Sequence, residues 1–142
     1  MSLETVANHM AAGGMAPNSQ QTGLREIDIL KQYFRQANVP PEQGVKLIEA
    51  ALKSGSKFTR SGNTLMAYKL LSPDTAQVYF FSVDIPHVFA QALGNLINKL
   101  KQAGVKAIYM NKVDPTIVST MQSIGINAQQ SNKPEYKIMA TL

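Results

Sequence analysis

Four side chains in the middle of the chain could donate or accept a proton in a reaction: Tyr79, Asp84, His87 and Tyr109. Carboxylate, imidazole and phenol groups all serve as general acids or bases. Asp84 stands where it would cap a following helix, so we expect a capping role. Tyr79 and Tyr109 lie in apolar segments, which favours packing, and His87 is a solitary histidine in a predicted first helical turn. The four residues do not by themselves define a catalytic site.

The segment SVDIPHVFAQALGNLINKL, residues 82–100, predicts a strand end that runs directly into a helix. Backbone N–H groups at such a helix start bind phosphate oxygens when glycines let the chain approach closely. Gly94 is the one glycine in this segment, and we interpret it as a point of close packing inside the helix. The junction therefore has the topology of a phosphate site without its glycines.

Composition limits the remaining chemistry. The chain has 142 residues, 44% of them hydrophobic, which fits one compact domain with one core. Zero cysteines exclude disulfides and thiolate sites, and two histidines are too few for a typical histidine-rich metal site, so we expect no metal. No apolar run approaches the roughly 20 residues that span a bilayer, and the first residues resemble no export signal. We therefore expect no membrane contact.

The chain is basic, with 14 Lys and Arg against nine Asp and Glu and a formal charge of +5. Such an excess favours contact with nucleic acid or an acidic protein surface. The candidate polyanion contacts gather around one predicted helix end and the next strand: Lys46, Lys53, Lys57 and Arg60. Dense basic runs are missing, so an ordinary solvated surface is the competing interpretation.

Residues 1–22, rich in Ala, Gly, Asn, Gln and Met, predict a flexible or partner-docked tail ahead of one domain at 23–142. Within this tail Leu3, Val6 and Met10 recur at spacings of three and four, which predicts a short amphipathic helix. A lone helix of this length is marginal in water. We therefore expect these three residues to dock on a neighbouring protein.

The remaining chain predicts alternating helices and strands. Two helices lead into three β-segments divided by turns, which we expect to form an antiparallel meander. The helix that follows is a crossover, so the next strand should pair in parallel with the strand that ends at Val83. The predicted helices are 24–38, 41–53, 85–103 and 115–124, and the predicted strands are 57–60, 64–71, 76–83, 105–111, 126–130 and 135–142.

This order from residue 57 onward, together with VKAIYMNKVDPTIVSTMQSIGI at 105–126, resembles the GNAT superfamily of acyl-CoA-dependent N-acetyltransferases. The most specific part is a strand, Asn111, a proline-started helix and Ser-Ile-Gly-Ile, which is similar to the family's Tyr-x-x-x-Gly-Phe segment. The resemblance implies an α/β (α+β) fold with a GNAT-like mixed twisted sheet, order α-α-β-β-β-α-β-α-β(-β). In the family, acetyl-CoA lies between two splayed parallel strands, with its pyrophosphate on the helix between them.

The sequence departs from the family at the pyrophosphate motif, Arg/Gln-x-x-Gly-x-Gly/Ala. If residues 96–97 are the Leu-Leu pair that follows the motif, the motif falls on residues 88–93. Val88 then replaces the leading Arg/Gln, and Gln91 and Leu93 replace the two glycines. Side chains would crowd the diphosphate, so we expect no bound cofactor.

The catalytic positions of the family also differ. Its acid tyrosine falls on Met121, which cannot donate a proton, and the segment AQVYFFSV at 76–83 holds no carboxylate to act as a base. The resemblance then implies the fold without its catalytic residues, a pseudoenzyme with no catalytic, cofactor or metal site. We expect the chain not to be an enzyme.

A small basic domain of this kind resembles the degenerate GNAT-like proteins of tailed bacteriophage particles. We accordingly expect a non-catalytic minor virion protein, made in the host cytoplasm, that docks on a neighbouring virion protein and lies near packaged DNA. Two alternatives stay open. One is an atypical acyl-CoA-dependent N-acetyltransferase, and the other is a small nucleic-acid-binding module built on the helix pair 24–38 and 41–53.

Overall fold

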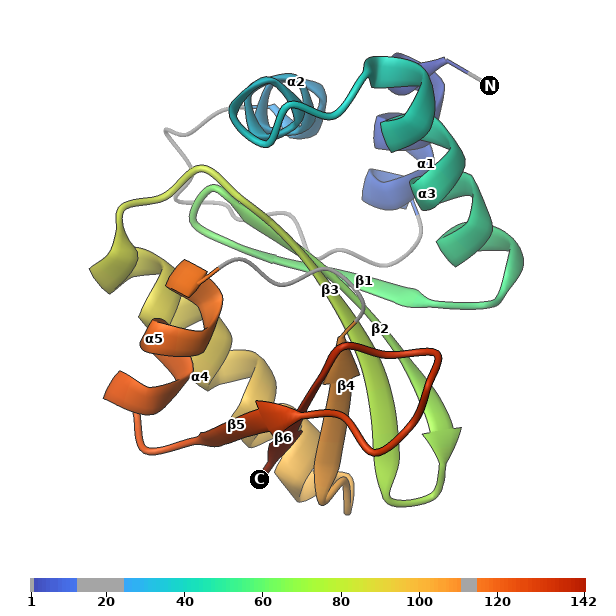
Figure 1. Ribbon diagram of the computed structural model, residues 1–142. Coiled ribbons are helices and arrows are strands. Elements are labelled where there is room, and N and C mark those ends of the chain that lie inside the picture. The colour runs from blue at the N-terminus through green and yellow to red at the C-terminus, as the bar shows by residue number, and fades with distance from the viewer. Residues whose placement is uncertain (1, 13–24, 111–114) are drawn as a thin grey trace. The chain divides into compact units, whose positions relative to one another are not determined.

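The computed structural model describes residues 2–12, 25–110 and 115–142, with the side chains of 9–12 and 115–116 left aside. Six strands form one mixed sheet in the order β1-β2-β3-β4-β6-β5 (Figure 1). The chain has the predicted α/β (α+β) class with one mixed sheet, which confirms the expected fold class. The elements are α1 Leu3–Ala12, α2 Glu26–Gln36, α3 Pro41–Lys53, β1 Lys57–Ser61, β2 Thr64–Ser72, β3 Thr75–Ser82, α4 Pro86–Gln102, β4 Ala107–Met110, α5 Pro115–Ser123, β5 Asn127–Gln130 and β6 Ile138–Thr141.

The chain divides into two compact units. The first unit comprises Met1–Ala67 and Phe80–Asp84, and the second comprises Tyr68–Tyr79 and Ile85–Leu142. The domain boundary predicted at residue 22 falls among residues outside the described part and remains a prediction.

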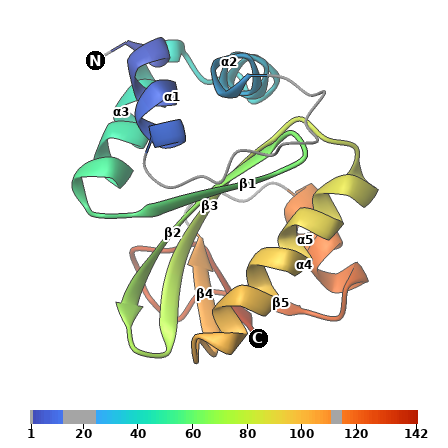
Figure 2. The same ribbon diagram turned by 180° about the vertical axis from the view of Figure 1, so that it is seen from behind.

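In the first unit, α1 packs against α2 and α3 (Figures 1 and 2). Apolar side chains of α2 and α3 are buried, among them Leu30 and Ile48, and Phe34 of α2 packs edge to face on Phe81 with ring centroids 6.0 Å apart. α2 and α3 also approach closely at Gly44, where an added Cβ would overlap the ring of Phe34. Only glycine fits at that position without moving the ring.

Asp84 stabilises the turn between β1 and β2 in the first unit and does not cap the next helix, so the capping prediction is wrong. Its Oδ2 accepts hydrogen bonds from the backbone N–H of Asn63 and the hydroxyl of Thr64, both at 2.8 Å. α4 instead has Ile85 as its N-cap, without a side-chain cap bond. Asp84 lies one residue too early to serve that helix, and the buried Thr64 hydroxyl needs an acceptor.

In the second unit, β4 pairs in parallel with β3, which confirms the crossover prediction. The register pairs Thr75 with Ala107 and Gln77 with Tyr109. β6 then pairs antiparallel with β4, and β5 antiparallel with β6. α4 and α5 pack side by side, and the loop 131–137 lies on the opposite face of these strands from α4 (Figures 1 and 2).

β4, β5 and β6 begin later in the chain than predicted. The N–H of Val105 bonds to the carbonyl of Leu100, so Val105 closes α4 and β4 begins only at Ala107. The stretch 135–137, predicted as strand, belongs to the loop before β6. Asn111, part of the family-like segment, lies outside the described residues. Among the helices that the structure describes, none has the length and apolarity to cross a membrane.

Candidate functional site

Three tyrosines meet on one face of the second unit's strands. Gln77 and Tyr109 are register partners on β3 and β4, and Tyr79 is two residues beyond Gln77, so all three side chains leave the same face of the sheet. Tyr136 reaches this face from the loop 131–137, and its ring centroid lies 5.4 Å from that of Tyr109. We call Gln77, Tyr79, Tyr109 and Tyr136 the tyrosine cluster.

Hydrogen bonds connect the cluster. The Tyr136 hydroxyl donates to Gln77 Oε1 at 3.2 Å, and Gln77 Nε2 donates to the Tyr79 hydroxyl through a short hydrogen bond. The Tyr109 hydroxyl donates to Asn132 Oδ1 at 3.2 Å. Tyr136 therefore donates its proton within the cluster and Tyr109 donates its proton to the loop residue Asn132, whereas Tyr79 accepts from Gln77 and its proton is not used in that bond.

The environment of Tyr136 disfavours its phenolate. Burial raises the pKa of Tyr136, and the neighbouring Tyr79 and Glu135 raise it further. Each of these causes acts against a negative charge on the phenol oxygen. Tyr136 therefore stays protonated at neutral pH and holds its hydrogen bond to Gln77.

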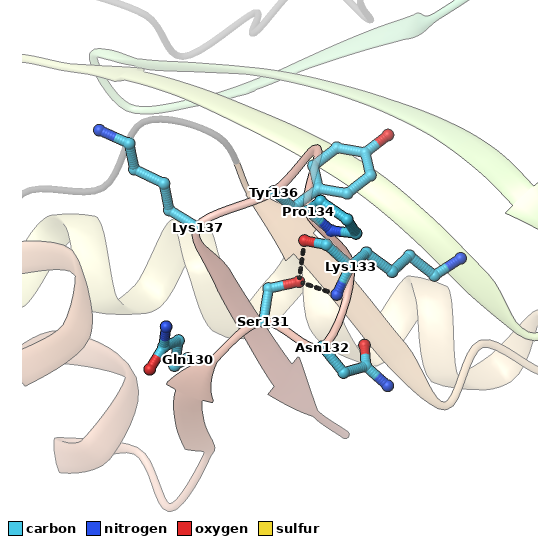
Figure 3. A pocket seen from close by; sticks show the side chains of 7 residues that line it. All are labelled: Gln130, Ser131, Asn132, Lys133, Pro134, Tyr136 and Lys137. Atoms are coloured by element: carbon cyan, nitrogen blue, oxygen red, sulfur yellow. Dashed lines mark hydrogen bonds between the residues drawn. The ribbon is translucent and has the colours of Figure 1, made fainter.

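A pocket of about 490 Å³ opens beside the cluster, lined by residues 130–134, 136 and 137 (Figure 3). The Ser131 hydroxyl fixes the turn, because it donates to the carbonyl of Lys133 and accepts from the N–H of the same residue. The Lys133 ammonium lies 5.0 Å from the centroid of the Tyr109 ring, a cation–π contact. Tyr136 belongs to both the pocket and the cluster.

The first turn of α4 does not fit the pyrophosphate of acetyl-CoA in the way that the GNAT motif does. Pro86 at its start has no N–H, and the N–H groups of Val88 and Phe89 both bond to the carbonyl of Ile85. Leu93, at one motif glycine position, is fully buried in the protein. Gly94 has no atom within 4 Å of an added Cβ, so its interpretation as a close packing point is wrong.

The predicted polyanion contacts differ in accessibility. Lys46, Lys53 and Lys57 are exposed on α3 and at the start of β1. The Arg60 side chain is only 3% exposed and pairs with Glu26 Oε1 at 3.3 Å, while its Nε bonds to the Gly62 carbonyl. Arg60 therefore acts within the first unit, and a polyanion role stays a prediction for the three lysines.

The predicted docking residues lie on α1. Val6 is fully buried and Leu3 half-buried, while the side chain of Met10 lies outside the described residues. Since α1 packs on α2 and α3, Val6 is already used inside the first unit. Docking of this helix on another protein stays a prediction.

The remaining candidate residues, His87 and Met121, do not belong to the tyrosine cluster. His87 is exposed at the start of α4, and Met121, at the family's acid position, is fully buried. In the part of the chain that the structure describes, no three His, Cys, Asp or Glu side chains gather as metal ligands would.

A scan against protein-family models found no match, and a search of curated proteins found none either. Solved structures with a similar chain path include an N-acetyltransferase from Staphylococcus aureus Mu50, at 10% identity and a TM-score of 0.47, covering 80% of this chain and 88% of that chain. Another is the ribosomal-protein-alanine N-acetyltransferase from Brucella melitensis, at 11% identity and a TM-score of 0.44, covering 99% of this chain and 93% of that chain.

These comparisons contradict the prediction that the chain is not an enzyme, because the solved structures found are described as acetyltransferases. We do not retain that prediction. The activities belong to those proteins, and any acyl transfer by this chain depends on its own residues.

Sequence reasoning named Tyr79 and Tyr109 as possible acids but assigned them to packing, and it missed Gln77, Lys133 and Tyr136. The alternation of Gln77 and Tyr79 within a strand was the available indication that both share a face. No periodicity marks residues 131–137, so their position over β3 and β4 could not be inferred from spacing.

Proposed function

We propose that the chain is an atypical acyl-CoA-dependent N-acyltransferase in which Tyr79 is the general acid. The observation that carries the proposal is the hydrogen-bonded series Tyr136–Gln77–Tyr79 at the end of the parallel β3–β4 pairing. Ligands of α/β sheets bind at the carboxyl ends of parallel strands. Tyr79 lies two residues beyond the last paired residue of β3, in that direction.

The direction of the hydrogen bonds singles out Tyr79. Gln77 presents its amide nitrogen to Tyr79 because its oxygen is occupied by the Tyr136 hydroxyl. The Gln77 amide is oriented by its two hydrogen bonds, with its oxygen toward the Tyr136 hydroxyl and its nitrogen toward the Tyr79 hydroxyl. The proton on Tyr79 is then directed away from Gln77, toward a bound reactant.

Attack of a neutral amine on a thioester forms the amide C–N bond and breaks the C–S bond, so the departing thiolate gains a proton and the amine nitrogen loses one to solvent. A tyrosine beside the scissile bond can supply the proton to the thiolate, and such proton transfer contributes about 10²–10⁴ in rate. The motif residues of α4 do not fit a pyrophosphate, so we assign no contact to that part of the donor. Recognition of the donor would depend on other residues, which makes the site atypical for the fold.

The test compares Tyr79→Phe with Tyr68→Phe, a substitution in the same unit whose ring contacts Lys99 and lies outside the tyrosine cluster. Thiol release from acetyl-CoA is measured with a panel of amines, and the absence of cysteine in this chain removes any protein background. We expect Tyr79→Phe to lower kcat about 100-fold or more and Tyr68→Phe to leave it unchanged.

Failure of the wild-type protein to release thiol with any amine, or equal rates for both variants, would reject the proposal. Titration of the wild type with acetyl-CoA alone distinguishes a wrongly assigned acid from a wrongly assigned substrate. Saturable binding without turnover would show a donor site whose acid is misassigned, whereas no binding would remove acyl-CoA as the substrate.

A second proposal keeps the location expected from the sequence, a bacteriophage particle in which the chain contacts other virion proteins and DNA. Three exposed lysines, Lys46, Lys53 and Lys57, favour it, since polyanion contact requires accessible cations. Purification from the native source tests this location. Co-sedimentation with a large particle is expected, and recovery as free protein only would contradict it.

A further inference from the structure

We infer that the pocket of loop 131–137 binds a small organic anion that carries a flat ring. The inference goes beyond the proposed acyl transfer and does not depend on it. The volume of the pocket, about 490 Å³, lies within the range of roughly 300–1,000 Å³ that is usual for small-molecule sites. The chemistry of the lining residues decides which ligand fits.

The walls of the pocket are already fixed. The N–H of Ser131 bonds to the carbonyl of Lys137 at 3.0 Å, which closes the loop at its base, and the N–H of Lys137 bonds to the carbonyl of Met110 of β4. The N–H of Tyr136 bonds to the carbonyl of Lys133, and the Ser131 hydroxyl holds the first turn. A loop with this many internal bonds loses little conformational entropy when a ligand enters.

Two charged side chains line the pocket, and both are cationic. Lys133 and Lys137 line the pocket, and among the described residues no carboxylate does, since Glu135 is exposed outside the lining. Asn132 accepts from the Tyr109 hydroxyl with its oxygen, which leaves the amide nitrogen as the donor side. Ammonium and amide N–H groups together favour a carboxylate or phosphate.

The apolar part of the lining is flat. Figure 3 shows the Tyr136 ring beside Pro134, with Lys133 and Asn132 extending on the same side of the loop and Lys137 on the other. The contact of Lys133 with the Tyr109 ring fixes its ammonium near this wall. A ring stacked on Tyr136 would therefore place its anionic substituent near Lys133, with Lys137 adding a more distant positive charge.

The experiment follows amide chemical shifts of residues 130–137 during titration with phenyl phosphate, benzoate and neutral benzyl alcohol. We expect one or both anions to saturate near about 1 mM or tighter, as fits ligands of this size, and benzyl alcohol to bind much more weakly. The tighter of the two anions identifies the anionic group as phosphate or carboxylate.

Variants test the role of Lys133. We expect Lys133→Gln to weaken anion binding about three- to tenfold, Lys133→Arg to retain it and Lys106→Gln, an exposed lysine of the same unit, to have no effect. Equal binding of benzyl alcohol, undiminished binding by Lys133→Gln in a folded protein, or no shift changes at 130–137 would overturn the inference. Unchanged amide chemical shifts of residues 130–137 in ligand-free Lys133→Gln exclude a loss of loop structure as the cause.

Discussion

The hydroxyl of Tyr136 and the guanidinium of Arg60 show how neighbours decide what a polar group can do. The Tyr136 hydroxyl donates to Gln77 Oε1 and so orients the amide, while burial of Tyr136 raises its pKa. Arg60 is nearly inaccessible and is held by Glu26 and the Gly62 carbonyl, so it cannot meet a polyanion as Lys57 can. At this scale, residue type gives the possible chemistry and contacts select among the possibilities.

A titration at this scale tests the Tyr136 environment. Absorbance of phenolate, taken as wild type minus Tyr136→Phe, isolates one of the five tyrosines, and we expect a midpoint above the usual value of 10.0. Because the folded pKa is raised, its stabilising contribution is complete below about pH 10 and is lost as pH rises through the higher folded pKa.

Unfolding by urea on both sides of pH 10 should accordingly show a steeper fall in stability for the wild type than for Tyr136→Phe. A difference spectrum with a midpoint at or below 10.0 would contradict the structure around this residue.

Among the helices, Gly44 and Gly94 differ in their surroundings, so we expect their replacement by Ala to change stability in opposite directions. Gly44 of α3 lies against the Phe34 ring, and Gly94 of α4 faces open space. We expect Gly44→Ala to destabilise the protein by about 1–3 kcal/mol through overpacking, and Gly94→Ala to stabilise it by about 0.5–1 kcal/mol through helix propensity.

Thermal and urea unfolding of the two variants measure these changes, and each variant serves as the control for the other. Equal effects of the same sign would contradict the close approach of α2 and α3.

For the molecule as a whole, the net charge of +5 favours binding of a polyanion only where the basic side chains are exposed to it. We expect DNA binding, if the virion proposal holds, to fall when Lys46, Lys53 and Lys57 are replaced by Gln. The slope of log affinity against log salt should flatten by about 0.9 for each lysine that contacts a phosphate. Gel shifts at two salt concentrations measure both quantities.

The matched control replaces Lys31, Lys101 and Lys106, which are also exposed and remove the same formal charge. Equal loss of binding in both triple variants would show that net charge alone matters. No shift of DNA by the wild type at roughly 50 mM salt would dismiss the polyanion role.

Sequence patterns alone predicted the order of helices and strands and the α/β (α+β) class of the fold. Periodicity, turn residues and the crossover helix after residue 84 depend on local geometry, so α3 begins at the predicted Pro41 and β4 pairs with β3 as expected. Strand ends were less predictable, because hydrogen bonds such as that from Val105 to Leu100 compete with strand pairing.

The candidate site could be recognised only from the folded structure. Gln77, Tyr109 and Tyr136 are separated by up to 59 positions, and their meeting depends on strand register and on a loop without periodicity. The same holds for Asp84, whose carboxylate serves a turn about 20 residues upstream instead of the next helix. Spacing along a chain predicts local structure, whereas long-range hydrogen bonds exist only once the strands have paired.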